Sequence, residues 1–154
     1  MEMSQQSVDR FCTLLQQKRD TLVSLEVNSL AMDKRLDNDV TSKGLCGLQH
    51  LRLLRLHCSV LDLDMQDLCM QDLCKAMESM PHLRTLQICV SEVAALTKFF
   101  NSSFRPITAF ELSAVRPVPD SHFAELLNAL KQNTRLRTLR VNEERFLRVL
   151  MSGL

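Results

Sequence analysis

Residues 51–56 read Leu-Arg-Leu-Leu-Arg-Leu, and residues 83–88 read Leu-Arg-Thr-Leu-Gln-Ile. Both segments follow the template Leu-x-x-Leu-x-Leu, in which large apolar side chains occupy the first, fourth and sixth positions. Three looser copies carry it at Leu22, Leu25 and Val27, at Ile107, Phe110 and Leu112, and at Leu136, Leu139 and Val141. The five copies begin 29, 32, 24 and 29 residues apart. This near-regular spacing indicates one short supersecondary unit repeated along the chain.

The stretches between the copies carry the spacing of amphipathic helices, with apolar side chains recurring every three or four residues. The clearest stripes are Val8, Phe11, Cys12 and Leu15, and Phe123, Leu126, Leu127 and Leu130. We expect Asp120 or Ser121 to cap the second of these helices, and Ser91 to cap a helix at residues 93–100. The pentapeptide Met-Gln-Asp-Leu-Cys occurs twice, at residues 65–69 and 70–74. This duplication lengthens the second interval and predicts an irregular helix there.

A short strand followed by a helix, repeated five times, predicts an α/β fold whose parallel strands lie side by side in chain order. The template copies resemble leucine-rich repeats, and their helical returns look like the ribonuclease-inhibitor-like class found inside cells. The resemblance covers roughly residues 8–151. It implies a curved solenoid, or horseshoe, of about five repeats with a parallel concave sheet and convex helices. We expect one domain over residues 1–154, with Leu54, Leu86 and Leu139 fully buried.

Residues 33–47, DKRLDNDVTSKGLCG, fit neither a strand nor a helix pattern. We expect an irregular loop there, in place of the helix of the first repeat. Neither end carries an evident polar cap, although stacked repeats need caps to stay soluble. The chain is therefore expected either to be a fragment or isoform of a longer solenoid, or to dock its ends onto another molecule. Because the caps are missing, purified chains should self-associate or aggregate through the uncapped ends.

Residues between the template leucines are expected to point away from the core onto the concave face, where equivalent positions form columns. One column collects Glu26, Arg55, Gln87, Glu111 and Arg140, and a second collects Val23, Arg52, Arg84, Thr108 and Arg137. Adjacent strands lie about 4.8 Å apart, so clustered arginines favour an acidic partner that offsets their repulsion. The alternative is a solvated face, whose arginines pair locally with Glu26, Glu111 and Glu143.

We therefore expect a non-catalytic protein–protein interaction module that binds another protein, of acidic surface, on the concave face. The residues expected to bind it are Arg52, Arg55, Arg84, Arg137, Arg140, Glu26 and Glu111. Nucleic acid is disfavoured, because the chain has a net charge of +1 and no aromatic side chains interleave with the arginines.

Two other functions stay open. Met65, Cys69 and Leu73 follow the spacing of the elongin-binding box, which would make the chain a substrate-recognition or adaptor subunit of a ubiquitin ligase; an ordinary core stripe has the same spacing. His57 and Cys89 fall in one column of adjacent strands, where an imidazole beside a thiol suits a thiol-dependent enzyme. Neither an orienting carboxylate nor a lid accompanies this pair, so we expect no enzyme.

Composition places the chain among intracellular globular proteins. Leucine supplies 28 of the 154 residues, while six cysteines are too few for a disulfide scaffold. The spacing of Cys46, His50, His57 and Cys58 matches no zinc motif, so we expect neither a metal nor another cofactor. The sequence shows no secretion signal and no apolar run long enough to cross a membrane. We expect a cytoplasmic or nuclear protein with no membrane partner.

Overall fold

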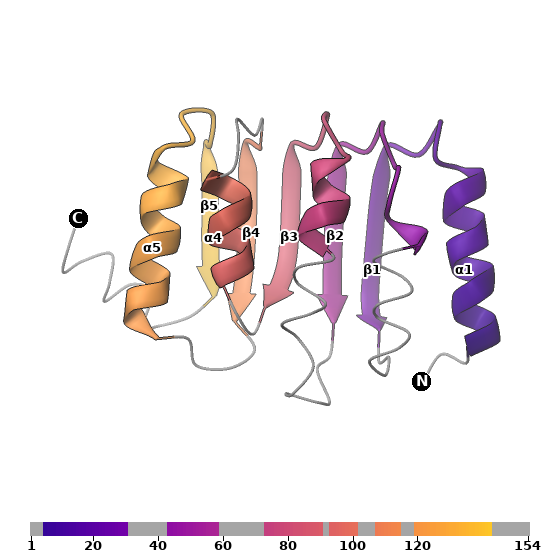
Figure 1. Cartoon of the computed structure of the whole chain (residues 1–154), viewed down its shortest axis with the longest axis horizontal. Coiled ribbons are helices and arrows are strands. Elements are labelled where there is room, and N and C mark those ends of the chain that lie inside the picture. The colour runs from indigo at the N-terminus through magenta and orange to yellow at the C-terminus, as the bar shows by residue number, and fades with distance from the viewer. Residues whose placement is uncertain are drawn as a thin grey trace.

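The computed structural model of the chain describes residues 5–30, 43–58, 73–90, 93–101, 107–114 and 119–142. These residues form an α/β structure with one parallel five-stranded sheet, whose strands lie side by side in chain order (Figure 1). The strands are β1 (Ser24–Leu30), β2 (Leu53–Cys58), β3 (Thr85–Val90), β4 (Ala109–Ala114) and β5 (Thr138–Asn142). The helices are α1 (Gln5–Gln17), α4 (Ala94–Asn101) and α5 (Asp120–Lys131), and residues 73–78 are helical as well.

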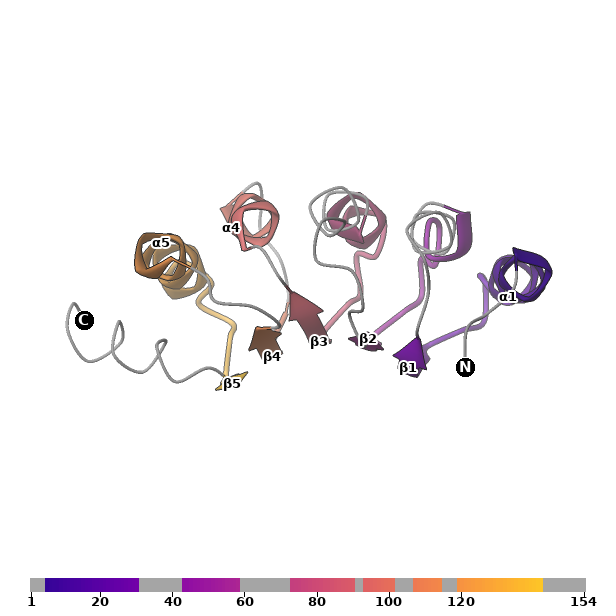
Figure 2. The ribbon, with the colours of Figure 1, turned by 90° about the horizontal axis from the view of Figure 1, so that it is seen from below.

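The helices lie together on one side of the sheet, so the described chain has two layers. Both layers bend, with the strands on the inside of the curve and the helices on the outside (Figure 2). Because each strand pairs with the next strand of the chain, each connection only crosses to the helix layer and returns. The other side of the sheet, which we call the inner face, is covered by no element of the described residues (Figure 2).

The template copies are aligned across the sheet as the sequence predicts. Leu54 lies opposite Leu25 on one side and Leu86 on the other, and Phe110 lies between Leu86 and Leu139. The last template positions are aligned in the same way, in the order Val27, Leu56, Ile88, Leu112 and Val141. Since side chains alternate between the two faces of a strand, both rows point into the helix layer.

The core lies between the two layers, and template residues are fully buried only in the three inner strands. Leu54 and Leu86 are 0% exposed, and Phe110 is 1% exposed. In the two outer strands, Leu25 is half-buried and Leu139 is 37% exposed. The prediction that Leu139 is fully buried is therefore wrong. Among the described strands β5 has a neighbour on one side only, so Leu139 lacks half of the packing that covers Leu86.

The two predicted apolar stripes face the core. The buried members are Val8, Cys12 and Leu15 on α1, and Phe123, Leu126, Leu127 and Leu130 on α5. Helix α5 is not capped as predicted, because Pro119 occupies the N-cap position and no side chain makes a capping hydrogen bond. Asp120 instead lies in the first turn, where its negative charge interacts favourably with the positive end of the helix dipole. The predicted cap Ser91 lies outside the described residues.

Residues 43–47, the described end of the predicted 33–47 loop, are tied to the core. Leu45 is 1% exposed. The side-chain amide of Gln16 on α1 donates to the carbonyl oxygens of Lys43, Gly44 and Cys46 at 2.8, 3.0 and 3.0 Å. Gly47 has a φ of 87°, a left-handed conformation that favours glycine. The rest of that loop and residues 65–72 of the duplicated segment lie outside the described residues.

Candidate interaction surface on the inner face of the sheet

Two columns of residues run from strand to strand, a central column within the strands of the inner face and an entry column at the edge of the sheet, directly before the strands begin. The central column contains Glu26, Arg55, Gln87, Glu111 and Arg140, which lie opposite one another in the parallel register. The entry column contains Val23, Arg52, Arg84, Thr108 and Arg137, at the beginning of the strands. In the entry column each backbone amide donates to the carbonyl of the preceding repeat, at 2.7 Å from Arg52 to Val23 and 2.8 Å in the three later steps. These columns follow from the register that the sequence predicts.

The sequence interpretation missed a third column on the same face. It contains Ser24, Leu53, Thr85, Ala109 and Thr138, which also lie opposite one another in the register. Its members are exposed in the outer strands and half-buried in the inner ones. The two-residue period of a strand carries the signal, since Leu53 must face the same side as Arg55. This uncharged column lies between the entry column and the central column.

One ion pair joins two members of the central column. The Nη1 atom of Arg55 lies 3.5 Å from Oε2 of Glu26, and the two side chains are 40% and 45% exposed. An exposed pair of this kind stabilises the fold by at most about 1 kcal/mol. The Nε atom of Arg55 is buried and has no hydrogen-bond partner among the described residues. Local pairing therefore satisfies this guanidinium group only in part.

The predicted local pairing does not extend along the described part of the central column. Glu111 lies directly opposite Arg140 in the register. Among the described residues, these two side chains form no ion pair within 4 Å. The third acid expected to pair with the arginines, Glu143, lies outside the described residues.

Taken together, the central and entry columns are more positive than the chain as a whole. The central and entry columns hold five arginines and two glutamates, a net charge of +3, whereas the whole chain carries +1. The other fourteen basic and sixteen acidic residues therefore carry −2. Arg52, Arg137 and Arg140 are exposed, and Arg55 and Arg84 are half-buried. This segregation of charge favours the approach of acidic groups to the inner face.

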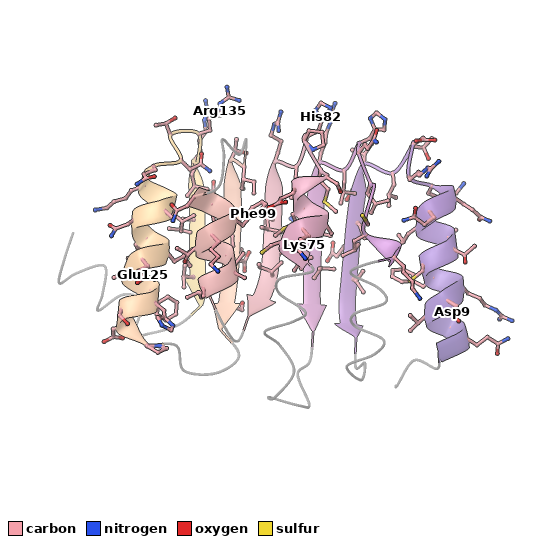
Figure 3. The ribbon with its side chains drawn as sticks, in the orientation of Figure 1. Asp9, Lys75, His82, Phe99, Glu125 and Arg135 are labelled. Atoms are coloured by element: carbon pink, nitrogen blue, oxygen red, sulfur yellow. The ribbon has the colours of Figure 1, made fainter. Side chains whose placement is uncertain are left out.

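A pair of histidines borders the entry column. His50 and His82 each stand immediately before the first template leucine of a repeat, and both side chains are exposed. Their rings are stacked, with centroids 6.4 Å apart and planes 5° from parallel. His82 lies at the edge of the sheet where the strands begin (Figure 3). The sequence interpretation missed this pair, although the repeat alignment contains it: each histidine stands two residues before an arginine of the entry column.

The described thiols divide into buried and exposed groups. Cys12 and Cys74 are buried, whereas Cys46 is exposed. Burial, followed by the negative charge of Glu78, raises the pKa of Cys74 from 9.0 to about 12. The Sγ atom of Cys74 lies 3.6 Å from the carbonyl oxygen of Ala95, which accepts a weak hydrogen bond. Cys74 is thus a protonated packing residue and not a nucleophile.

The proposed thiol pair lies in the predicted strands. His57 is opposite Asn28, and Cys89 is opposite Ser113. The side chains of His57 and Cys89 lie outside the described part of the structure, so a thiol-dependent reaction stays a prediction. Two of the three residues that match the elongin-binding spacing, Met65 and Cys69, also lie outside the described residues. Leu73 is 6% exposed and belongs to the core, as the simpler interpretation of that spacing expects.

Within the described segments, no group of three or more histidine, cysteine, aspartate or glutamate side chains could hold a metal ion. In the same segments, every helix is too short or too polar to cross a membrane. A comparison with protein-family models found no match, and a comparison with curated proteins found no significant match.

Proposed function

We propose that the chain is a leucine-rich-repeat protein of the ribonuclease-inhibitor-like class that binds an acidic protein partner on its inner face. The repeat assignment is supported by the Leu-x-x-Leu-x-Leu template, by the strand order, and by the position of the strands inside the curve (Figure 2). A repeat of this kind cannot bury its apolar face alone, so neighbouring repeats share one core. This solenoid arrangement leaves the inner face for a partner.

The observation that carries the proposed function is the alignment of the central and entry columns. Residues far apart in the sequence, such as Arg52 and Arg137, are aligned along one edge of the sheet by the backbone ladder of the entry column, beside the inner face. Arginine side chains form forked hydrogen bonds with carboxylates, and they retain their charge at all ordinary pH values. An acidic segment laid across the strands could therefore contact both arginine columns, separated by the uncharged column.

The proposed role is binding and not catalysis. The guanidinium groups on the inner face recognise anions but offer neither a general base nor a nucleophile. The alternative role as an adaptor in ubiquitin ligation has no observation in its favour among the described residues. A protein of either kind acts in the cytoplasm or nucleus, in agreement with the small number of cysteines.

A peptide rich in aspartate and glutamate tests the proposed function directly. We expect fluorescence anisotropy to show binding that weakens as salt rises from about 0.05 to about 0.3 M, because exposed charge pairs are screened. The double variant Arg55→Glu, Arg84→Glu should weaken binding at least about tenfold, since two lost exposed ion pairs of about 0.7 kcal/mol each amount to about 1.4 kcal/mol.

Lys98→Glu is the matched control. Lys98 is exposed on α4 in the helix layer, so reversal of its charge should leave binding within about twofold of the parent. Equal affinity of the parent and the double variant would remove the inner face from the proposal. Loss of binding on deletion of residues 33–42 alone, which keeps the core residue Leu45, would assign the binding site to that segment instead.

A further inference from the structure

Four residues whose side chains can carry positive charge lie in adjacent repeats where β2 and β3 begin. Arg52 and Arg84 are neighbours in the entry column, because the amide of Arg84 donates to the carbonyl of Arg52 at 2.8 Å. His50 and His82 stand two residues before them and stack on each other. Two adjacent repeats thus present the same His-Leu-Arg sequence at the same edge of the sheet. We call these four residues the His-Arg corner.

The His-Arg corner has no acidic side chain paired with it among the described residues. The Nη1 atom of Arg84 donates a long hydrogen bond, 3.5 Å, to the carbonyl oxygen of Leu83. The charged groups on the adjoining described segments are Lys18, Arg19 and Asp20 before β1, and Lys75 and Glu78 on helix 73–78. Neither Asp20 nor Glu78 forms an ion pair within 4 Å of a described residue. The corner therefore has unused capacity to donate to an anion.

We propose that the His-Arg corner binds a phosphomonoester dianion, carried by a phosphoserine or phosphothreonine of the protein partner. This inference rests on the proposed function, because that partner occupies the inner face beside the corner. A phosphate offers three acceptor oxygens and close to two negative charges, which match two guanidinium groups and two imidazoles from adjacent repeats. A single carboxylate would engage only part of this donor set.

The histidines add a pH dependence to phosphate binding. Lowering the pH from about 7.5 to about 6.5 favours protonated imidazole, which donates from both ring nitrogens instead of one. A phosphomonoester, with a second pKa of about 6, stays mainly dianionic over the same range. Without an anion, two protonated rings stacked 6.4 Å apart repel each other. Phosphate binding and protonation of His50 and His82 should therefore strengthen each other.

Proton NMR with inorganic phosphate is the first test, because the chain has only four histidines. Spectra of His50→Gln and His82→Gln assign the two rings. We expect phosphate, compared with chloride at equal ionic strength, to raise the pKa of both rings and to leave His122 on α5 unchanged. The double variant Arg52→Gln, Arg84→Gln should abolish this shift. Equal titration of His50 and His82 in phosphate and in chloride would overturn the inference.

The second test compares an acidic peptide containing one phosphoserine with the same peptide containing serine. We expect at least about tenfold tighter binding of the phosphopeptide, a preference that grows between about pH 7.5 and about pH 6.5. The double variant His50→Gln, His82→Gln should abolish the increase of this preference at lower pH. The double variant Arg52→Gln, Arg84→Gln should abolish the preference for the phosphopeptide itself. If both peptides bind equally to the parent, the inference fails while the proposed function stands. If neither peptide binds, both fail.

Discussion

Leu86 lies in the middle strand of the sheet, with Leu54 and Phe110 opposite it and no exposed surface. Replacement by alanine removes buried methyl groups and leaves a cavity, so Leu86→Ala should cost about 2–5 kcal/mol of unfolding free energy. Leu139→Ala is the matched control, because the same template position in β5 is 37% exposed. Urea denaturation should show a clearly lower midpoint for Leu86→Ala than for Leu139→Ala. Equal midpoints would mean that the sheet register is wrong.

Cys74 and Cys46 should differ sharply in reactivity. The raised pKa of Cys74, about 12, keeps its thiol protonated, whereas the reactive species is the thiolate. At about pH 8, alkylation of Cys74 followed by mass spectrometry of its peptide should be at least about tenfold slower than alkylation of exposed Cys46. Comparable rates in the folded protein would show that Cys74 is not buried.

The raised pKa of the Cys74 thiol predicts that the folded chain loses stability at high pH. Above the ordinary pKa of 9.0, the unfolded chain releases the Cys74 proton while the folded chain keeps it. The unfolded state then binds fewer protons, so unfolding free energy falls as pH rises from 9.0 towards about 12. The variant Cys74→Ala should show a smaller fall over this range in urea denaturation.

At the scale of elements, Gln16 joins α1 to the segment that leads into β2. Its amide reaches three backbone carbonyls, including those of Lys43 and Gly44, across 27 and 28 residues of sequence. Gln16→Ala should cost about 0.5–1.5 kcal/mol, because the carbonyls lose a protein donor and the exposed ones can bind water in its place. Gln17→Ala, at an exposed neighbouring position of the same helix, should cost less than about 0.5 kcal/mol. Indistinguishable denaturation midpoints would show that these hydrogen bonds are not formed in solution.

At the scale of the whole molecule, apolar side chains stay exposed at the two outer strands and on α1. Leu14 is 50% exposed on α1, and Val23 is 47% exposed just before β1. We expect purified chains to self-associate, because such surface is more stable when it is covered. Leu14→Lys should weaken this association in sedimentation at several concentrations, whereas Gln17→Lys, with the same added charge, should not. A monomer at every concentration would contradict the expectation.

The template leucines were sufficient to predict the α/β class, the parallel strand order and the register, and with them the alignment of the central column. This was possible because the side-chain direction along a strand follows from covalent geometry, with a period of two residues. Once Leu54 and Leu86 are aligned, the alignment of Arg55 with Gln87 follows. The third column, which contains Leu53, obeys the same period and could have been predicted in the same way.

Burial and proximity were decided only by the tertiary structure, because they depend on neighbours that are distant in sequence. Leu139 and Leu86 hold the same place in the template, yet only Leu86 has a described strand on each side. The stacking of His50 on His82 depends on the geometry of two turns 32 residues apart. The raised pKa of Cys74 depends on how completely its surroundings exclude water. Local sequence pattern thus determined which way each side chain points, and packing between repeats determined what it meets there.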